Sequence, residues 1–216
     1  MKHIKKLLLC AMIAALLAVP FQGVALAENQ AAPQTGFAER EGFVPGAVPA
    51  ETGAVQAMTP AIHAVILAML HYDMASFDPS HPQFSWEALY NMLSLYGQLD
   101  ERSDYLGERL VLPVETVMDF SAALFPSFSA LGTLPGALAD RMVYDPEIDS
   151  YLLTCGSDSL AEIRLTAETW NARGELELSG ALVYLVDGTD LARFQATLSP
   201  RDSMFGYTLS ALVLDA

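Results

Sequence analysis

The hydrophobic pattern of this chain changes its period near Arg141. Between residues 59 and 125, apolar residues recur three and four positions apart, which is the spacing of one face of an α-helix. Beyond Arg141 they alternate with polar residues, as in strands that bury one face. The order of the two patterns predicts helices followed by antiparallel strands, and therefore an α+β fold in which the helices cover the sheet.

Three helices are predicted in the first half. We expect the first over residues 59–74, because Thr59–Pro60 supplies an N-cap followed by proline at the first helical position. The second is expected from about residue 85 to Gly97, a residue suited to a left-handed C-cap. The third is expected over residues 113–125, between two prolines.

The second half predicts a five- to six-stranded antiparallel meander with these three helices packed on one of its faces. Asp187–Gly188 indicates a type I′ hairpin between two of the strands. The apolar positions of helices and strands should form one core. The members expected in it are Trp86, Leu89, Leu93, Val117, Met118, Ile163, Leu165, Leu178, Leu182 and Phe194.

The amino terminus has the pattern of an export signal. Residues 1–6 are basic, residues 7–19 are apolar, and Ala25-Leu26-Ala27 matches the small-x-small cleavage pattern. We expect residues 1–27 to be a cleaved signal peptide, residues 28–57 to be a spacer rich in Ala, Pro and Gly, and residues 58–216 to be a single domain. The protein should be secreted, or periplasmic where the source has an outer membrane. The alternative is an uncleaved anchor over residues 7–27, long enough to span a bilayer.

The charge distribution excludes several partners. All three lysines lie within the first six residues, so residues 28–216 carry eight arginines against 26 acidic residues, a formal charge of −18. Such a chain repels phosphate backbones and anionic headgroups, so we expect no nucleic-acid binding and no membrane anchoring after cleavage. Cleavage would also leave Cys155 as the only cysteine, expected to fill a gap in the core.

The order of helices followed by an antiparallel meander resembles the nuclear-transport-factor-2-like and cystatin-like folds. The segments Tyr144–Tyr151 and Phe205-Gly206-Tyr207 also resemble segments of uncharacterised exported proteins of anaerobic Gram-positive bacteria. That second group implies no known activity. The first implies an alternative function, a small-molecule enzyme or pocket protein of ketosteroid-isomerase type, with an apolar cone between helices and sheet. His63 and Tyr184 are the residues that could line such a pocket.

Two segments contain residues of the types that bind metal ions. His71, Asp73, Asp78 and His81 lie within eleven residues, but without a helical His-x3-His spacing and with two prolines in the loop, so we expect a polar loop and no metal. Residues 145–149 place three acids at the spacing that begins a calcium loop. Ser150 stands where such a loop needs glycine, so a solvated hairpin turn is expected there. No cofactor is predicted.

A binding or interaction module is the function that the sequence favours. Polar residues on one side of neighbouring strands could form a docking surface for a basic protein or peptide, or for a peptide strand added at a free edge. These residues are Glu162, Arg164, Glu168, Glu175, Glu177, Arg193 and Gln195. A merely solvated sheet face is the simpler interpretation of the same pattern. The hydrolase and nucleotide motifs with recognised spacing are absent from the sequence, and an enzyme is not favoured.

Overall fold

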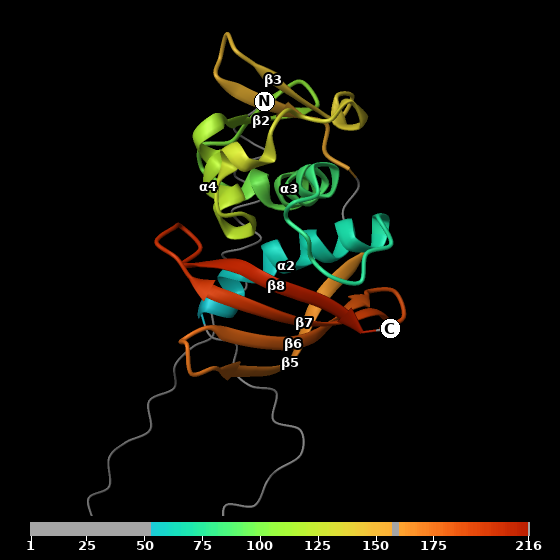
Figure 1. Cartoon of the computed structure of the whole chain (residues 1–216). Helices are drawn as coiled ribbons and strands as arrows, with labels where there is room; N and C mark the ends of the chain where they lie inside the picture. Colours follow the sequence, from blue (N-terminus) through green and yellow to red (C-terminus); the bar gives the residue numbers. More distant parts are fainter. Residues whose placement is uncertain (1–52, 157–159, 216) are drawn as a thin grey trace, which may run out of the picture. The chain divides into compact units, whose positions relative to one another are not determined.

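The computed structural model describes residues 53–156 and 160–215 of this 216-residue chain, within a compact unit of residues 45–216. The predicted signal peptide and most of the predicted spacer lie outside the described residues. In the described residues the fold is α+β (Figure 1). It has three α-helices and two four-stranded antiparallel sheets, and two strands of one sheet precede the third helix in the chain.

The first helix, α2, runs from Gly53 to His71 and begins six residues before the predicted start. Pro60 therefore lies inside the helix and not at its first position. Thr59, predicted as the N-cap, instead donates its hydroxyl to the carbonyl of Val55, one turn earlier. The burial of Val55 explains the early start, because the added turn extends the apolar face into the core.

Helix α2 is apolar on nearly all sides. By length and hydropathy it could span a membrane, the one helix of the described residues that could. In the fold, ten of its 19 residues are buried, and it packs against α3 and against strands β5 and β8. An apolar helix of this kind is also what a core position between two layers requires.

Helix α3 spans Pro82–Tyr96. Its N-cap is His81, whose Nδ1 accepts a hydrogen bond from the backbone N–H of Phe84 at 3.1 Å. Gly97 follows the helix with right-handed angles and enters the short 3-10 helix η1, Gly97–Leu99, so the predicted left-handed cap is wrong. Glycine fits there without displacing its neighbours, because a Cβ atom at this position would lie 3.0 Å from Cδ1 of Leu112.

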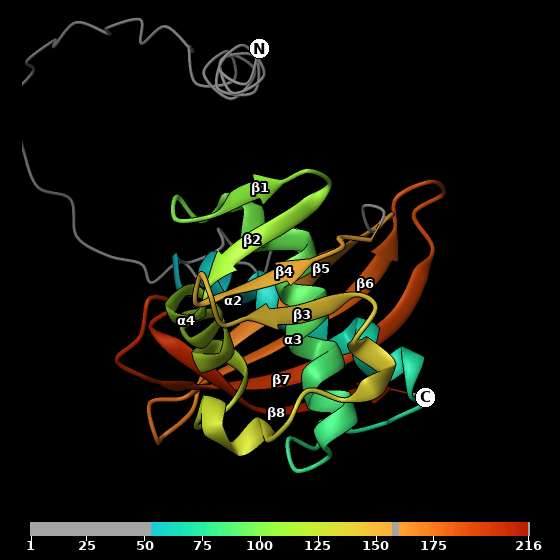
Figure 2. The same ribbon diagram turned by 90° about the horizontal axis from the view of Figure 1, so that it is seen from above.

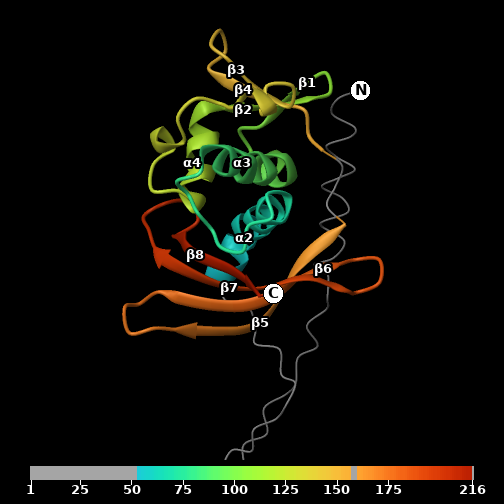
Figure 3. The same ribbon diagram turned by 45° about the vertical axis from the view of Figure 1, so that its right-hand side comes forward.

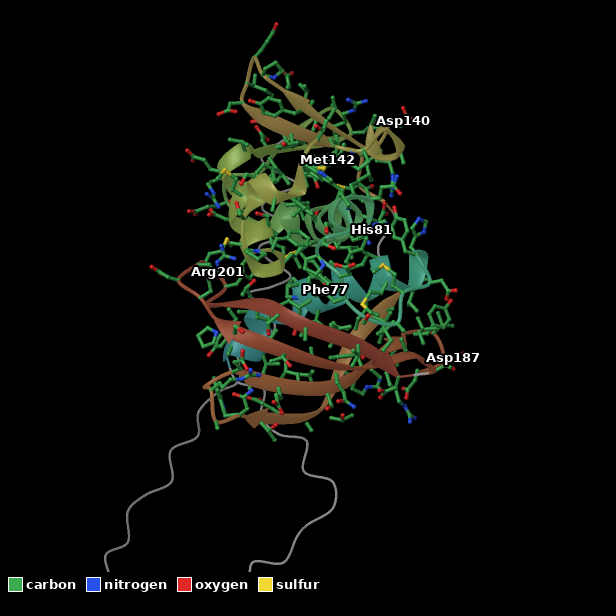
Figure 4. All side chains as sticks on the ribbon, in the orientation of Figure 1. Phe77, His81, Asp140, Met142, Asp187 and Arg201 are labelled. Carbon is green, nitrogen blue, oxygen red and sulfur yellow. The ribbon has the colours of Figure 1, made fainter. Side chains whose placement is uncertain are left out.

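Helix α4 spans Val114–Leu124, as the two flanking prolines predict. Met118 was expected in the core but is 48% exposed, since Val117 and Phe120 take the buried face. The carboxyl end of α4 is held by Arg201, which comes from the turn between β7 and β8 (Figure 4). Its guanidinium donates to the carbonyls of Ala122, Phe125 and Pro126 at 2.6–3.0 Å. These bonds satisfy carbonyls that the helix itself leaves without partners.

The strands form two sheets, so the prediction of one five- to six-stranded meander is wrong. Only the last four strands form the meander, in the order β5-β6-β7-β8. The hairpin around the acidic turn predicted at residues 145–149 pairs instead with an earlier hairpin, giving the order β1-β2-β4-β3. We call this second sheet the small sheet. Its strands are β1 (Asp104–Leu106), β2 (Arg109–Pro113), β3 (Met142–Asp145) and β4 (Ser150–Leu153).

The segment that joins α4 to the small sheet contains two 3-10 helices, η2 (Phe128–Leu131) and η3 (Gly136–Leu138). Trp86 of α3 donates its indole N–H to the carbonyl of Leu131 at 3.1 Å and packs against Phe128 and Tyr151. The predicted core residue Trp86 is therefore buried, with its indole against η2 and the small sheet.

The meander consists of β5 (Ala161–Trp170), β6 (Leu176–Tyr184), β7 (Asp190–Pro200) and β8 (Tyr207–Asp215). The expected Asp187–Gly188 hairpin is present, with Asp187 near its tip (Figure 4). A type I′ turn has two loop residues, both with a positive φ. This loop has five residues, and of Asp187 and Gly188 only Gly188 has a positive φ, so the turn is not type I′. Strand β6 ends at Tyr184, before the loop begins.

The helices lie between the two sheets. Figures 1 and 3 show the small sheet, then α3 and α4, then α2, then the meander, and Figure 2 shows the small sheet from above. Helix α2 packs on the meander, whereas α4 contacts both the meander and the small sheet. One continuous apolar core runs through these layers. A bidentate pair between Glu87 of α3 and Arg141, at 3.0 and 2.7 Å, ties α3 to the start of the small sheet's second hairpin.

Candidate functional site

His63 lies on the buried face of α2 and is 4% exposed. Its Nδ1 is 2.6 Å from the hydroxyl of Tyr96, at the end of α3. Desolvation by burial lowers the pKa of the imidazole to about 4, and burial raises the pKa of the Tyr96 phenol. His63 is therefore neutral near pH 7. Its contact with Tyr96 joins α2 to α3 within the core.

Tyr184 stands at the last position of β6, opposite Ala161 of β5, and is half-buried. Its backbone N–H donates to the carbonyl of Thr189 and its carbonyl accepts from Gly188, which closes the β6–β7 hairpin. The structure thus places the two residues of the predicted ligand pocket in different settings, one between helices and one at a hairpin. The ligand role of His63 and Tyr184 stays a prediction.

The four residues weighed as metal ligands serve local turns. His81 caps α3, and Asp78 accepts hydrogen bonds from the backbone N–H and hydroxyl of Ser80 at 2.9 and 2.7 Å. These bonds lower the pKa of the Asp78 carboxyl. Asp73 has a positive φ just after α2, and the His71 ring packs edge-on against Tyr72. Among the described residues, no three His, Cys, Asp or Glu side chains are placed to share a metal ion.

The acidic turn between β3 and β4 is also organised by its own side chains. Asp145 accepts a hydrogen bond from the backbone N–H of Glu147 at 2.9 Å, and Asp149 accepts one from the hydroxyl of Tyr144 at 2.6 Å. Asp149 has a positive φ, the conformation that short polar residues tolerate in tight turns. This is the solvated hairpin turn that the sequence predicts.

The outer face of the meander carries most of the polar residues predicted to form a docking surface. Its acids are partly neutralised, because Arg164 pairs with Glu162 at 3.5 Å and Arg193 pairs with Asp190 at 3.1 Å. Glu168 is not part of this face. A β-bulge between Leu165 and Ala167 reverses the alternation, so Glu168 stands opposite the buried Leu178.

The small sheet presents a second surface that sequence reasoning missed. Its inner positions Leu110, Leu153 and Met142 are buried against the helices. On the opposite side, one row across the four strands consists of Asp104, Val111, Leu152 and Val143, and Asp145 stands two residues beyond Val143 on the same face. We call these five residues the small-sheet surface. It is an apolar stripe with a carboxylate at each end, in which Val143 is 40% exposed, Val111 is partly buried and Leu152 is only 8% exposed.

The surroundings of the small-sheet surface are strongly acidic. Residues 97–153 contain ten acidic residues and three arginines, whereas the meander contains eight and four. One of the three arginines, Arg102, is engaged by Asp100 and Asp119 at 2.8 Å, and another, Arg141, by Glu87. Val143 and Ile148 are 40% and 50% exposed beside these charges. Exposed apolar groups and an excess of negative charge therefore occur together at this end of the fold.

Comparison of the chain with protein-family models, with curated proteins and with solved structures gives no match.

Proposed function

We propose that this protein is a non-enzymatic binding module whose small-sheet surface docks a basic protein or peptide segment. The observation that carries the proposal is the row Asp104–Val111–Leu152–Val143, an apolar stripe that is bounded by carboxylates and faces away from the helices. Apolar contact supplies affinity, and complementary charge steers the partner and fixes its register.

The small-sheet surface suits a basic partner better than the outer face of the meander does. On the meander, Arg164 pairs with Glu162 and Arg193 with Asp190, so less negative charge is left for a partner that carries several cations. On the small sheet Arg109 stands on the same face as Val111, but Arg102 and Arg141 pair with acids, and the formal charge of residues 97–153 is −7. The field at this end therefore attracts cationic segments.

The spacing of the row indicates the form of the partner. Neighbouring strands lie about 4.8 Å apart, so the row from β1 to β3 spans about 14 Å. In an extended peptide, residues i and i+4 lie on the same side about 13 Å apart, with residue i+2 between them. A segment with basic residues at i and i+4 and an apolar residue at i+2 would place its charges at Asp104 and Asp145 and its apolar side chain on the stripe.

The test uses the blocked peptide acetyl-Lys-Ser-Leu-Ser-Lys-amide and the chain without residues 1–27. Binding measured by calorimetry should weaken roughly tenfold in the double variant Asp104→Lys/Asp145→Lys, since two reversed charges at the peptide cost about 1–2 kcal/mol in total. The matched control, Asp202→Lys/Glu177→Lys, changes the net charge equally but places both changes on the meander. Equal weakening by the two double variants would show that only net charge matters and would overturn the proposal.

We also propose that the chain is exported and acts outside the cytoplasm. The basic start, the apolar run of residues 7–19 and the Ala25-Leu26-Ala27 pattern support it. Mass spectrometry of the protein from the culture medium or the periplasm should find a chain that begins at or near Glu28. A chain that retains residues 1–27 would contradict cleavage.

A further inference from the structure

A hollow of about 280 Å³ lies on the outer face of the meander, on the side of this sheet away from α2. Its floor consists of short side chains on the central strand β6, Ser179 and Ala181, and its walls are long side chains on the neighbouring strands, Arg164 and Arg193. Short residues between long ones produce a trough in a sheet that would otherwise be flat. The volume is close to the lower end of the range for small-molecule pockets, about 300–1,000 Å³.

Two irregularities of the sheet shape this hollow. The bulge between Leu165 and Ala167 leaves Thr166, on the face that carries Arg164, without a partner on β6 and brings Ala167 opposite Ser179 on the same face. A second irregularity, in the pairing of β6 with β7, leaves Leu191 unpaired and puts Asp190 opposite Val183, on the face that carries Arg193. Without the irregularity in β7, strict alternation would turn Asp190 toward the helices. Bulges are common where a sheet must re-aim a side chain toward a ligand.

Gly180 allows the first bulge to approach the central strand. A Cβ atom at this position would lie 2.6 Å from the backbone oxygen of Arg164 and 2.9 Å from the ring of Phe194. Only glycine leaves room for both groups. A larger residue at this position would displace the backbone of β5 or the buried ring of Phe194 beneath the floor.

The charges around the hollow are of both signs and are arranged across the strands. Arg164 stands on β5 at one side, and Asp215 stands on β8 at the other, in the same row as Ala181 and Arg193. Among the described residues, the ion pair that Arg164 forms is with Glu162 at 3.5 Å, and both of these side chains are about half exposed. Exposed pairs of this kind are worth little, so the Arg164 guanidinium can turn to a ligand at small cost.

We propose that the hollow binds a short peptide with free ends, whose carboxylate is bound by Arg164 and whose ammonium group is bound by Asp215. Three strand spacings separate the two residues, about 14 Å between Cα atoms, and the reach of their side chains shortens this gap. A tripeptide spans at most about 10 Å. The guanidinium suits a carboxylate because it can form two parallel hydrogen bonds, and the short side chains of the floor leave room for small side chains of the peptide. This site is separate from the small-sheet surface and takes a different ligand.

The test titrates the chain without residues 1–27 with trialanine, trialanine amide and acetyl-trialanine near pH 7, followed by NMR. Trialanine should bind saturably with shifts at Ser179, Ala181 and Gln195, and blocking either end should weaken binding roughly tenfold, the effect of one lost charged contact. Arg164→Gln should reduce the affinity for trialanine to that for its amide while leaving the affinity for the amide unchanged. Asp215→Asn should reduce the affinity for trialanine to that for acetyl-trialanine while leaving the affinity for acetyl-trialanine unchanged.

The matched control is Arg173→Gln, which removes an arginine from the β5–β6 turn, where Arg173 pairs with Glu175. It should change none of the three affinities. Equal binding of trialanine and its blocked forms would overturn the proposal, as would the absence of saturable binding up to about 10 mM. An equal loss for all three peptides in Arg164→Gln would also overturn it, because a structural effect would produce that pattern.

Discussion

Acidification should destabilise this protein through His63 in a pH range where carboxyl groups contribute little. The pKa of His63 is about 4 in the folded chain and 6.5 in the unfolded chain. Above pH 6.5 the imidazole is neutral in both states and has no effect. As the pH falls below 6.5 the unfolded state takes up the proton first, so stability is lost until the pH reaches about 4.

The magnitude follows from the two pKa values. The full difference corresponds to about 3 kcal/mol, and about 2 kcal/mol of it should be lost between pH 7 and pH 5. Carboxyl groups with lowered pKa values, such as Asp100, lose their contribution only as the pH falls below their ordinary value of 3.8 and so lie outside this window. A marginally stable domain would lose a substantial part of its unfolding free energy.

Urea denaturation at pH 7, 6 and 5 measures this effect directly. In His63→Gln the dependence on pH should be reduced by about 2 kcal/mol relative to the unmodified chain. Tyr96→Phe removes the hydroxyl beside Nδ1 and should retain the dependence, because burial and not this contact lowers the pKa. The reasoning fails if His63→Gln and the unmodified chain lose stability equally between pH 7 and 5, or if Tyr96→Phe alone abolishes the loss.

Three further predictions concern the core and the sheets, each checked by urea denaturation at pH 7. Trp86→Ala should cost about 3–5 kcal/mol because it empties the space between α3 and the small sheet, and an unchanged midpoint would mean that α3 does not pack as described. Arg141→Met should cost about 1–3 kcal/mol, less than for a fully buried pair, because the side chain of Glu87 is 7% exposed but that of Arg141 is 39% exposed. Gly180→Ala should cost about 1–3 kcal/mol or more through overpacking, whereas Gly136→Ala, with open space around its Cβ position, should cost much less, and equal effects would contradict the close approach at the bulge.

The sequence predicts the local elements well because their signals are local. The prolines at 113 and 126 bound α4, and the alternation of apolar residues marks β5 to β8. Helix starts are less well predicted. The Thr59–Pro60 pair has the pattern of a helix start, but burial of Val55 extends α2 by six residues beyond it. Tertiary packing outweighs a local propensity here.

The division of the strands into two sheets is not encoded by any local signal. Strand β2 pairs with β4 across about forty residues that contain α4, and the length of β1 is only three residues. A signal for the first hairpin was present, because Gly107 and Glu108 separate β1 from β2 and Gly107 has a positive φ. Even with this hairpin identified, the small-sheet surface depends on the register of four strands. Alternation within one strand gives the face of a residue but not its neighbour across the sheet.

The bulges are the other feature that alternation conceals. Glu168 was expected on the outer face because a regular strand would place it there, and one extra residue at Thr166 moves it to the inner face. The sequence signal was Gly180 in the middle of strand β6, since an isolated glycine in a strand indicates a bulge or a close backbone approach.

The central claim, that the small-sheet surface binds a basic segment, is tested most directly by mapping the contact residue by residue. Backbone amide resonances of the chain without residues 1–27 would be followed by NMR during titration with acetyl-Lys-Ser-Leu-Ser-Lys-amide. The largest shifts should occur at Asp104, Val111, Leu152 and Val143, and they should diminish as salt is added, because charge contributes to binding. Shifts concentrated on the meander, or spread evenly over exposed acids, would contradict the account.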